Sequence, residues 1–355
     1  MQILLVVLGL LIIAIVSFDV LITTLTLGGG GPITSRLSCW LWKIALKIHS
    51  KFSSHQILLI TGWTILVSMA LLWFLLDLVG WTLLFTSHES AVVNATTKLP
   101  AGIWERIYFA CYTLSTLGMG DYQPQGDVWQ IATAIASTHG FFLVTLTFAY
   151  LLPVVSAATN QRQLAVYISS LGGTGDEILI RAWNGENFGQ FEQHLFALAP
   201  MLCQQGEAHF NYPVLHYFHN LERDQSIILS LVALDEAMTL IEYGVKRSYH
   251  PDRSALNSAR RASAAYLNTL KSAYLKPSDR HPPLPDLHRL RVAGIPTVTD
   301  EEFRQATQKL TRRRQLLLAL IEHDGWTWDA IASSKTTNRA SHLDDETMIN
   351  EAVLH

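Results

Sequence analysis

The segment of residues 113–121, which reads TLSTLGMGD, contains the residue types in this chain that are best placed to do chemistry. Gly118 and Gly120 alternate in it with residues that carry side chains. Successive backbone carbonyls point the same way only when alternate residues adopt dihedrals that are costly for residues other than glycine. Rings of such carbonyls from four chains can replace the water around a cation, and the Thr116 hydroxyl would add the innermost ring. The pattern predicts a loop that coordinates ions through its backbone.

The rest of the chain has the composition of a membrane protein. It has 355 residues, of which 49% are hydrophobic and only 15% are charged, which is too apolar for an ordinary soluble protein. Three stretches are as long as the roughly 20 apolar residues that a bilayer requires. They cover residues 3–27, about 56–85 and about 128–156. The first lacks a basic leader and a cleavage site, so we interpret it as a membrane helix and not as a secretory signal.

The distribution of basic residues predicts the orientation of these helices. Arg36, Lys43, Lys47 and Lys51 lie between the first two stretches, whereas the segment before the third carries fewer basic residues. Because basic loops stay in the cytoplasm, we expect the N-terminus and residues 86–127 outside and everything after Ser156 inside. Residues 33–52 also place apolar and basic side chains on different helical faces, which is typical of a helix lying along the inner leaflet.

Residues 101–115, directly before the loop, predict a short helix that does not cross the membrane. Non-helical backbone at membrane depth is tolerated only where protein buries it or where it lines water. A short helix followed by a glycine-rich return has the form of a pore loop, and the negative end of the helix would favour a cation.

The sequence TLSTLGMGD resembles the TxxTxGxGD signature of the potassium channel family, and the resemblance covers about residues 55–157. It implies a selectivity filter that four identical subunits complete around K⁺ ions, with a glycine hinge in the inner helix. The implied filter is Thr116, Leu117, Gly118, Met119 and Gly120, followed by the outer-mouth carboxylate Asp121. The implied pore-helix residues are Tyr108, Phe109 and Thr113, and the implied hinge is Gly140.

Met119 departs from the family pattern, which most often has Tyr, Phe or Leu there. A tyrosine hydroxyl at this position would brace the filter from behind, and a thioether is only a weak acceptor. Ion-facing groups in the loop are backbone atoms, so coordination should survive. The substitution therefore bears on the rigidity and selectivity of the filter.

The third membrane stretch also carries a candidate pore-lining stripe by the same resemblance. Its members are Phe141, Val144, Phe148 and Leu152. Their spacing keeps them on one helical face, as a hydrophobic gate requires. The alternative is that they face lipid or the protein core, because the whole stretch is apolar.

Four polar or aromatic residues stand out in the first two stretches. Asp19 would be an ion or proton contact, or alternatively a helix-to-helix hydrogen bond. Trp73 and Trp81 fit an interfacial aromatic belt, with Asp77 between them near headgroup level. We find no repeat of arginines that would sense voltage.

The second half of the chain shows mostly helical periodicity, over residues 191–203, 212–219, 227–244 and 255–274 and in a last helix near residues 300–323. The sequence LGGTGD at residues 171–176 superficially repeats the loop motif, but no membrane stretch follows it, so we interpret it as a break between helices. No strand precedes a GxGxxG motif, which argues against a nucleotide-binding domain. Arg312, Arg313 and Arg314 are expected on a solvated helix face.

Histidines supply the other candidate chemistry. His209, His216 and His219 would share a metal ion or sense protons, with His216 and His219 three apart on a predicted helix. The alternative is that they pack among Tyr212, Tyr217 and Phe218. His139, beside Gly140, would sense pH or form a hydrogen bond behind the filter.

These observations predict an all-α fold with four parts. Residues 1–54 form a transmembrane helix and an interfacial helix, 55–157 the pore domain, 158–332 a cytosolic helical domain, and 333–355 a flexible tail. The first hypothesis for function is a potassium-selective channel of the cell membrane. The alternatives are a weakly selective cation channel and a membrane metal or ligand sensor. We expect identical subunits and lipid as partners, and neither an enzyme, an organic cofactor nor nucleic acid, since the net charge of −3 marks no nucleic-acid surface.

Overall fold

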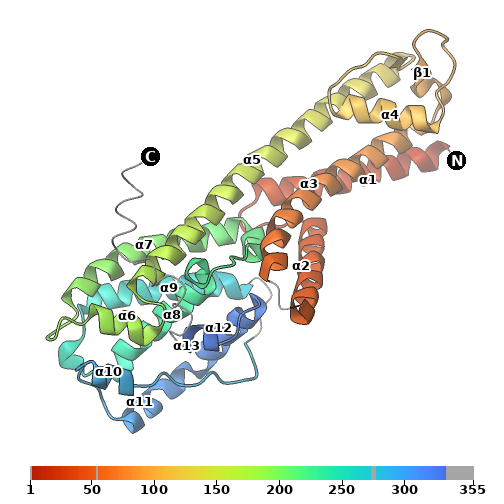
Figure 1. Ribbon diagram of the computed structural model, residues 1–355. Helices are drawn as coiled ribbons and strands as arrows, with labels where there is room; N and C mark the ends of the chain where they lie inside the picture. Colours follow the sequence, from red (N-terminus) through yellow and green to blue (C-terminus); the bar gives the residue numbers. More distant parts are fainter. Residues whose placement is uncertain (1, 53–54, 273–276, 333–355) are drawn as a thin grey trace, which may run out of the picture. The chain divides into compact units, whose positions relative to one another are not determined.

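The computed structural model describes residues 2–52, 55–272 and 277–332, and the predicted tail at 333–355 lies outside these ranges (Figure 1). The chain divides into two compact units. The first contains residues 1–158 and 208–218, and the second contains residues 159–207 and 219–355. The predicted all-α fold is confirmed, since the two strands are only two residues long.

The first unit contains the three apolar helices that were predicted to cross the membrane. They are α1 (Gln2–Leu25), α3 (His55–Thr86) and α5 (Asp127–Leu171), each long and apolar enough to span a bilayer. The end of α5 differs from the prediction, because the helix continues well beyond residue 156. The shorter helices are α2 (Pro32–Phe52) and α4 (Ile103–Leu114). The strands β1 (Val93–Asn94) and β2 (Tyr122–Gln123) pair antiparallel.

Glycines allow α1 and α3 to approach closely, and the two helices lie antiparallel and side by side in Figure 1, in red and orange. A Cβ atom on Gly9 would lie 2.7 Å from the carbonyl oxygen of Gly80, and one on Gly80 would lie 3.1 Å from the carbonyl oxygen of Gly9. Helices in a membrane associate through such van der Waals contacts, because lipid removes the hydrophobic driving force between them. The two glycines therefore determine how tightly α1 packs on α3.

Asp19 ties the end of α1 to α2 and α3. Its carboxylate accepts hydrogen bonds from the Ile33 amide at 2.7 Å, the Thr34 hydroxyl at 2.7 Å and the Trp73 indole at 2.9 Å. The Ile33 amide belongs to the first turn of α2, where unpaired donors and the positive end of the helix dipole favour a carboxylate. Asp19 is completely buried. The interpretation of Asp19 as a helix-to-helix hydrogen bond is therefore confirmed.

The prediction for the tryptophans was wrong. Trp73 is fully buried and Trp81 is almost so, and Trp73 donates to Asp19. Asp77 is also buried, within the helical bundle. These three side chains occupy protein-facing positions of α3, which the largely apolar sequence of the helix could not distinguish from lipid-facing ones.

Helix α2 has one buried face and one exposed face. Thr34, Ser38, Trp42 and Ala45 are buried, and all four of the predicted basic residues are exposed with Trp40, Ile44 and Ile48 beside them. The exposed face thus combines the basic and apolar rows that suit a membrane interface.

The second unit contains short helices packed around one hydrophobic core. Its α-helices, besides the end of α5, are α6 (Gly175–Ala182), α7 (Gly189–Asn211, which ends in the first unit), α8 (Ile227–Thr239), α9 (Arg253–Ser272), α10 (His288–Val292), α11 (Asp300–Thr307), α12 (Thr311–His323) and α13 (Asp329–Ala332). Every residue of α8 is buried, so the other helices pack around it. The break predicted at LGGTGD is confirmed, because α5 ends at Leu171 and α6 begins at Gly175.

The arginine run at the start of α12 is solvated only in part: Arg312 is exposed as predicted, whereas Arg313 is half-buried and Arg314 is buried. Arg314 is only 4% exposed and forms a two-pronged pair with Glu236, with N–O distances of 3.0 and 3.1 Å. Arg313 and Arg260 both bind the fully buried Asp235. Adjacent acids on the buried helix α8 require partners, and only tertiary contact supplies them.

The Asp19 contacts predict the effect of removing its acceptor. We expect Asp19→Ala to lower the melting temperature of the detergent-solubilised protein clearly, because each buried donor left without an acceptor costs about 1–3 kcal/mol. Asp19→Asn keeps one acceptor oxygen, so its melting temperature should lie between those of the unchanged protein and Asp19→Ala. Thr24→Val is the control, since that hydroxyl bonds only a carbonyl of its own helix at 2.8 Å. Equal melting temperatures for Asp19→Ala and Thr24→Val would contradict the role of Asp19.

Asp235 predicts how the second unit responds to acid. Burial alone would raise the pKa of Asp235, but Arg260 and Arg313 outweigh burial and lower it. The stabilisation from a lowered carboxyl pKa is complete above the unfolded value of about 4 and is lost as the pH falls through the folded value. Asp235→Asn should therefore lower the melting temperature strongly at pH 7 and less at pH 3.5. Asp300→Asn, which breaks an exposed ion pair with Arg291, should have little effect at either pH.

Candidate functional site

The end of helix α4 sets the direction of the TLGMGD loop. The Thr116 amide donates to the Thr113 carbonyl at 3.1 Å, and the Leu117 amide donates to the Tyr112 carbonyl at 2.9 Å. This pair of bonds is the Schellman arrangement, which closes a helix through one residue in the left-handed conformation. That residue is Thr116, with φ of 59°, where glycine is usual. The chain thus accepts some backbone strain to start the loop here.

The loop itself has the alternating backbone that the sequence predicted. Thr116, Gly118 and Gly120 have φ angles of 59°, 60° and 84°, and Leu117 and Met119 between them do not have positive φ. A Cβ atom on Gly118 or Gly120 would meet no atom within 4 Å. Backbone conformation, rather than space within this chain, therefore accounts for both glycines.

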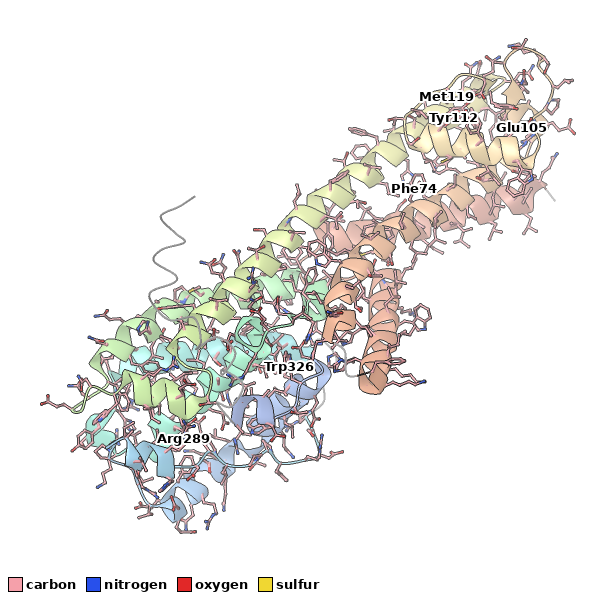
Figure 2. The ribbon with its side chains drawn as sticks, viewed as in Figure 1. Phe74, Glu105, Tyr112, Met119, Arg289 and Trp326 are labelled. Carbon is pink, nitrogen blue, oxygen red and sulfur yellow. The ribbon has the colours of Figure 1, made fainter. Side chains whose placement is uncertain are left out.

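Tyrosines brace the outer end of the loop. The Tyr112 hydroxyl donates to the Tyr122 carbonyl at 2.6 Å, and the Tyr122 hydroxyl donates to Glu105 at 2.6 Å (Figure 2 labels Tyr112, Glu105 and Met119). The Ala95 amide donates to the Asp121 carbonyl at 2.9 Å, next to the β1–β2 pair. Tyr108 lies near the same end, with its ring centre 6.2 Å from that of Tyr122, and desolvation and Asp121 raise the pKa of Tyr108.

Sequence reasoning missed this brace, because it looked for the tyrosine at position 119. The signal was present in the spacing of Tyr108 and Tyr112, which places both on one face of α4. Glu105 also holds the start of the helix, where it accepts from the Gly102 amide at 2.6 Å. The same carboxylate thus links the start of α4 to the chain that follows the loop.

Gly140 brings α5 against the end of α4. A Cβ atom on Gly140 would lie 2.1 Å from the Leu114 carbonyl oxygen, so no larger residue fits without movement of both backbones. The residue that the sequence predicted as a hinge is therefore a site of close packing in this conformation. Its role as a hinge stays a prediction.

A polar cluster joins α1, α3 and α5 beside Gly140. His139 places Nε2 at 2.9 Å from the Ser17 hydroxyl, and its Nδ1 lies 3.2 Å from both Asp77 and the Trp81 indole nitrogen. An unprotonated Nδ1 accepts from Trp81, whereas a protonated Nδ1 donates to Asp77. Neither oxygen of the buried Asp77 carboxylate accepts a hydrogen bond within the described part of the chain, and His139 Nδ1 lies within ion-pair distance of it. His139 thus forms hydrogen bonds with partners in α1 and α3, and the predicted bond behind the filter and the predicted pH sensing both stay predictions.

Arg106 fixes α4 to the end of α3. It is 5% exposed and donates to the carbonyls of Ala101 and His88 at 2.8 Å and to the carbonyl of Phe85. In the same contact, Phe85 and Phe109 meet edge to face with ring centres 5.1 Å apart. These contacts hold the short helix at one end of the first unit (Figure 1).

The loop and the predicted pore stripe are exposed in a single chain. Leu117 is 66% and Met119 57% exposed, although both are large and apolar. The four stripe residues are also exposed, Leu152 most of all at 70%. Surfaces of this kind require lipid or another protein to cover them.

The three predicted metal-site histidines do not form a metal site. His209 is buried against His216, with ring centres 5.9 Å apart, and burial lowers the pKa of His209 to about 4. His216 lies in a 3-10 turn (Pro213–Tyr217) that ends before His219, so the predicted shared helix is wrong. His219 lies 3.3 Å from Asp324. Within the described ranges, no three His, Cys, Asp or Glu side chains could hold a metal ion.

Comparison with known proteins identifies the pore region. Residues 63–157 match a family model described as an ion channel, and this match spans α4, the loop and the membrane part of α5. The chain belongs to the potassium-channel-like family of ion channels. The channel is also 36% identical over 321 residues to YdjJ, an uncharacterized membrane protein of Bacillus subtilis. That alignment covers 90% of this chain and 94% of YdjJ, so the relative shares both units. No solved structure matches the channel.

The contact at Gly140 predicts that a single methyl group disturbs the channel. We expect Gly140→Ala to reduce ion flux into proteoliposomes by about tenfold, because the new methyl group must displace either Leu114 or α5. Thr138→Ala is the control, since Thr138 is exposed on the same helix and bonds only the Ala134 carbonyl. Normal flux through Gly140→Ala would show that the close contact is not required.

Proposed function

We propose that this protein is a potassium-selective channel whose filter is formed by four copies of the loop TLGMGD. The observation that carries the proposal is the alternation of positive φ at Thr116, Gly118 and Gly120 directly after the closed end of α4. This alternation directs successive carbonyl oxygens to one side, where they can take the place of water around K⁺. In this proposal α4 is the pore helix.

The exposure of the loop supports assembly into a ring. A cavity of about 420 Å³ opens beside the loop, lined by residues of α4, the loop and α5 such as Thr113, Gly118 and Thr133. One loop per chain covers only part of an ion, and a cyclic arrangement of identical chains is the usual way to close the ring. A homotetramer would bury the exposed loop and bring the stripe on α5 toward a common axis.

The proposed orientation follows from the basic residues. The exposed basic face of α2 would lie at the inner surface of the cell membrane, with the N-terminus and β1–β2 outside. The second unit would then be cytosolic. We also propose that the loop selects K⁺ over Na⁺. The hydrogen bonds of Tyr112 and Tyr122 support this, because they hold the outer part of the loop rigid despite Met119.

The weakly selective cation channel remains the second candidate because of Met119, which is 57% exposed in a single chain. A filter that lacks a brace at this level would widen more easily and pass Na⁺ as well. The metal-sensor alternative has no such support, since the histidines do not converge within the described residues.

Purified protein in planar bilayers tests the proposal. With K⁺ on one side and Na⁺ on the other, we expect the reversal potential to lie near the K⁺ limit. A reversal potential near zero would identify the weakly selective channel instead. Gly118→Asp should abolish the current, because it adds a charged side chain to each of the four loops and positive φ costs more for any such residue than for glycine. Currents that survive Gly118→Asp would contradict conduction through this loop.

Met119→Tyr tests which brace determines selectivity. If the brace at Tyr112 and Tyr122 suffices, this variant should change the K⁺ to Na⁺ permeability ratio less than about twofold. Tyr112→Phe, which loses only the hydroxyl that holds the Tyr122 carbonyl, should lower the same ratio more strongly. The opposite order of effects would place the determining brace at position 119.

A further inference from the structure

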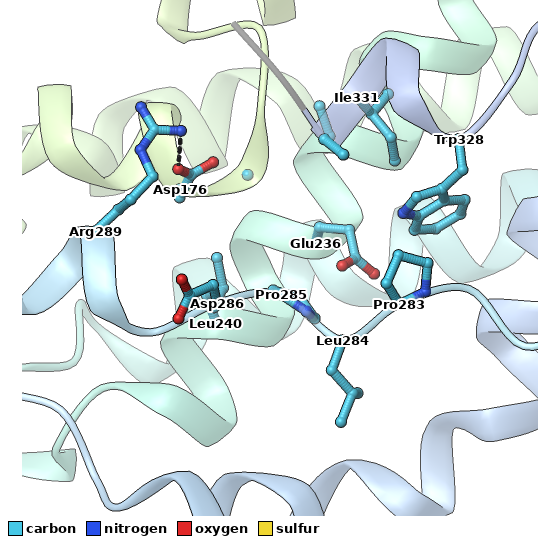
Figure 3. A pocket seen from close by; sticks show the side chains of 13 residues that line it. Asp176, Glu236, Leu240, Pro283, Leu284, Pro285, Asp286, Arg289, Trp328 and Ile331 are labelled. Atoms are coloured by element: carbon cyan, nitrogen blue, oxygen red, sulfur yellow. Dashed lines mark ion pairs between the residues drawn. The ribbon is translucent and has the colours of Figure 1, made fainter.

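The second unit contains a cavity that the ion pathway does not use. It has a volume of about 310 Å³ and lies at the start of α6 (Figure 3). Its walls come from α6, α8, the loop at residues 283–286, α10 and α13, with Trp328 just before α13. Cavities of about 300–1,000 Å³ are typical of small-molecule sites. Segments far apart in the sequence therefore converge on a space large enough for a small ligand.

Arg314 holds several of these walls in place. Its guanidinium binds both oxygens of Glu236, donates to the Pro283 carbonyl at 2.7 Å and lies 5.7 Å from the centre of the Trp328 ring. Because Arg314 is 5% exposed at its side chain, these contacts are protected from water. The cavity is thus formed by a fixed framework rather than by loosely packed side chains.

The glycine-rich break LGGTGD forms another wall. A Cβ atom on Gly175 would lie 2.8 Å from the Ala237 amide nitrogen, so the start of α6 presses against α8. Thr174 caps α6 by accepting from the Glu177 amide at 3.2 Å, and its hydroxyl donates to Asp176 at 2.5 Å. Asp176 lines the cavity and forms an ion pair with Arg289, as the dashed line in Figure 3 shows.

The charges of the lining favour a cation. Three carboxylates line the cavity, those of Asp176, Glu236 and Asp286, against the single guanidinium of Arg289. Arg314 neutralises Glu236 from behind, whereas Asp286 accepts from the His288 amide at 2.8 Å and forms no salt bridge with any described residue. Asp176 at the start of α6 also offsets the positive end of that helix. The net charge of the cavity lining is therefore negative.

The other lining residues offer an apolar surface. Trp328 and Pro283 lie on one side in Figure 3, with Ile331 above them and Leu284 below, and Glu236 lies between Trp328 and the Asp176–Arg289 pair. An indole ring attracts cations through its face, as Arg314 already demonstrates at Trp328. Carboxylates and an aromatic ring around one space are the groups that recognise an amine with an apolar body.

We propose that this cavity binds a compact organic cation, with its ammonium group toward Asp176 and Asp286 and its apolar body against Trp328 and Pro283. Arg289 occupies the Asp176 end of the site as an internal competitor. The proposal is independent of ion conduction, since every residue in it belongs to the second unit.

Calorimetric titration of the full-length protein with three probes of similar size tests the charge of the ligand. The probes are benzylammonium, neutral benzyl alcohol and anionic benzoate. We expect benzylammonium to bind most tightly, because only it meets the excess of carboxylates. Tighter binding of benzoate, or no binding of any probe, would overturn the proposal.

Two exposed lining residues then locate the site. Asp286→Asn should weaken benzylammonium binding by about three- to fivefold, as expected for the loss of one partly screened charge. Arg289→Gln should strengthen it by about threefold or more, because Asp176 loses its competing cation. An anion site would respond to Arg289→Gln in the opposite direction, so this variant separates the two possibilities by sign.

Glu186→Gln is the matched control, since it removes an exposed carboxylate of the same unit outside the cavity. It should leave the affinity for benzylammonium unchanged. Organic cations can also enter an ion pathway, and binding there would not respond to Asp286→Asn or Arg289→Gln. An affinity that is the same in both variants and in the control would therefore place the cation elsewhere and overturn the proposal.

Discussion

The closed C-terminal turn of α4 is the interaction on which the pore region depends. Two backbone hydrogen bonds, to the carbonyls of Tyr112 and Thr113, end the helix and start the loop in one direction. The same turn presents the Leu114 carbonyl to Gly140 on α5 and the Tyr112 hydroxyl to the chain after the loop. Non-helical backbone inside a membrane must have such partners, because no bulk water replaces them. One helix end therefore fixes the loop, its brace and the neighbouring helix together.

Buried polar groups connect the membrane helices in two different ways. Asp19 has several donors from α2 and α3, so it acts as a fixed joint between three helices. Asp77 meets only His139 among the described residues, and His139 changes its hydrogen bond according to which nitrogen carries the proton. A carboxylate whose single partner can point its proton elsewhere is less firmly held than one with several fixed donors. The contacts between Asp77 and His139 can therefore rearrange more easily than the hydrogen bonds of Asp19.

The second unit uses buried ion pairs where a soluble helical domain would more often use apolar contacts. Asp235 and Glu236 are adjacent on the buried helix α8 and are matched by Arg260, Arg313 and Arg314. Such pairs add little net stability but strongly penalise any arrangement that separates them. They select one packing of α8, α9 and α12, and the same packing creates the cavity beside Glu236. Because the relative YdjJ aligns over 94% of its length, it shares this unit as well as the pore region.

The sequence by itself determined the features that depend on neighbouring residues in the chain. Apolar length identified α1, α3 and α5, and alternating glycines identified the loop backbone, because both are local requirements. Tertiary structure decided which face of each helix is buried and which charges meet. It placed Trp73 and Trp81 inside the protein, separated His216 from His219, buried Arg314 and gave the brace to Tyr112 rather than to residue 119. Each of these outcomes depends on a partner distant in the sequence, and periodicity within a single helix carries no information about that partner.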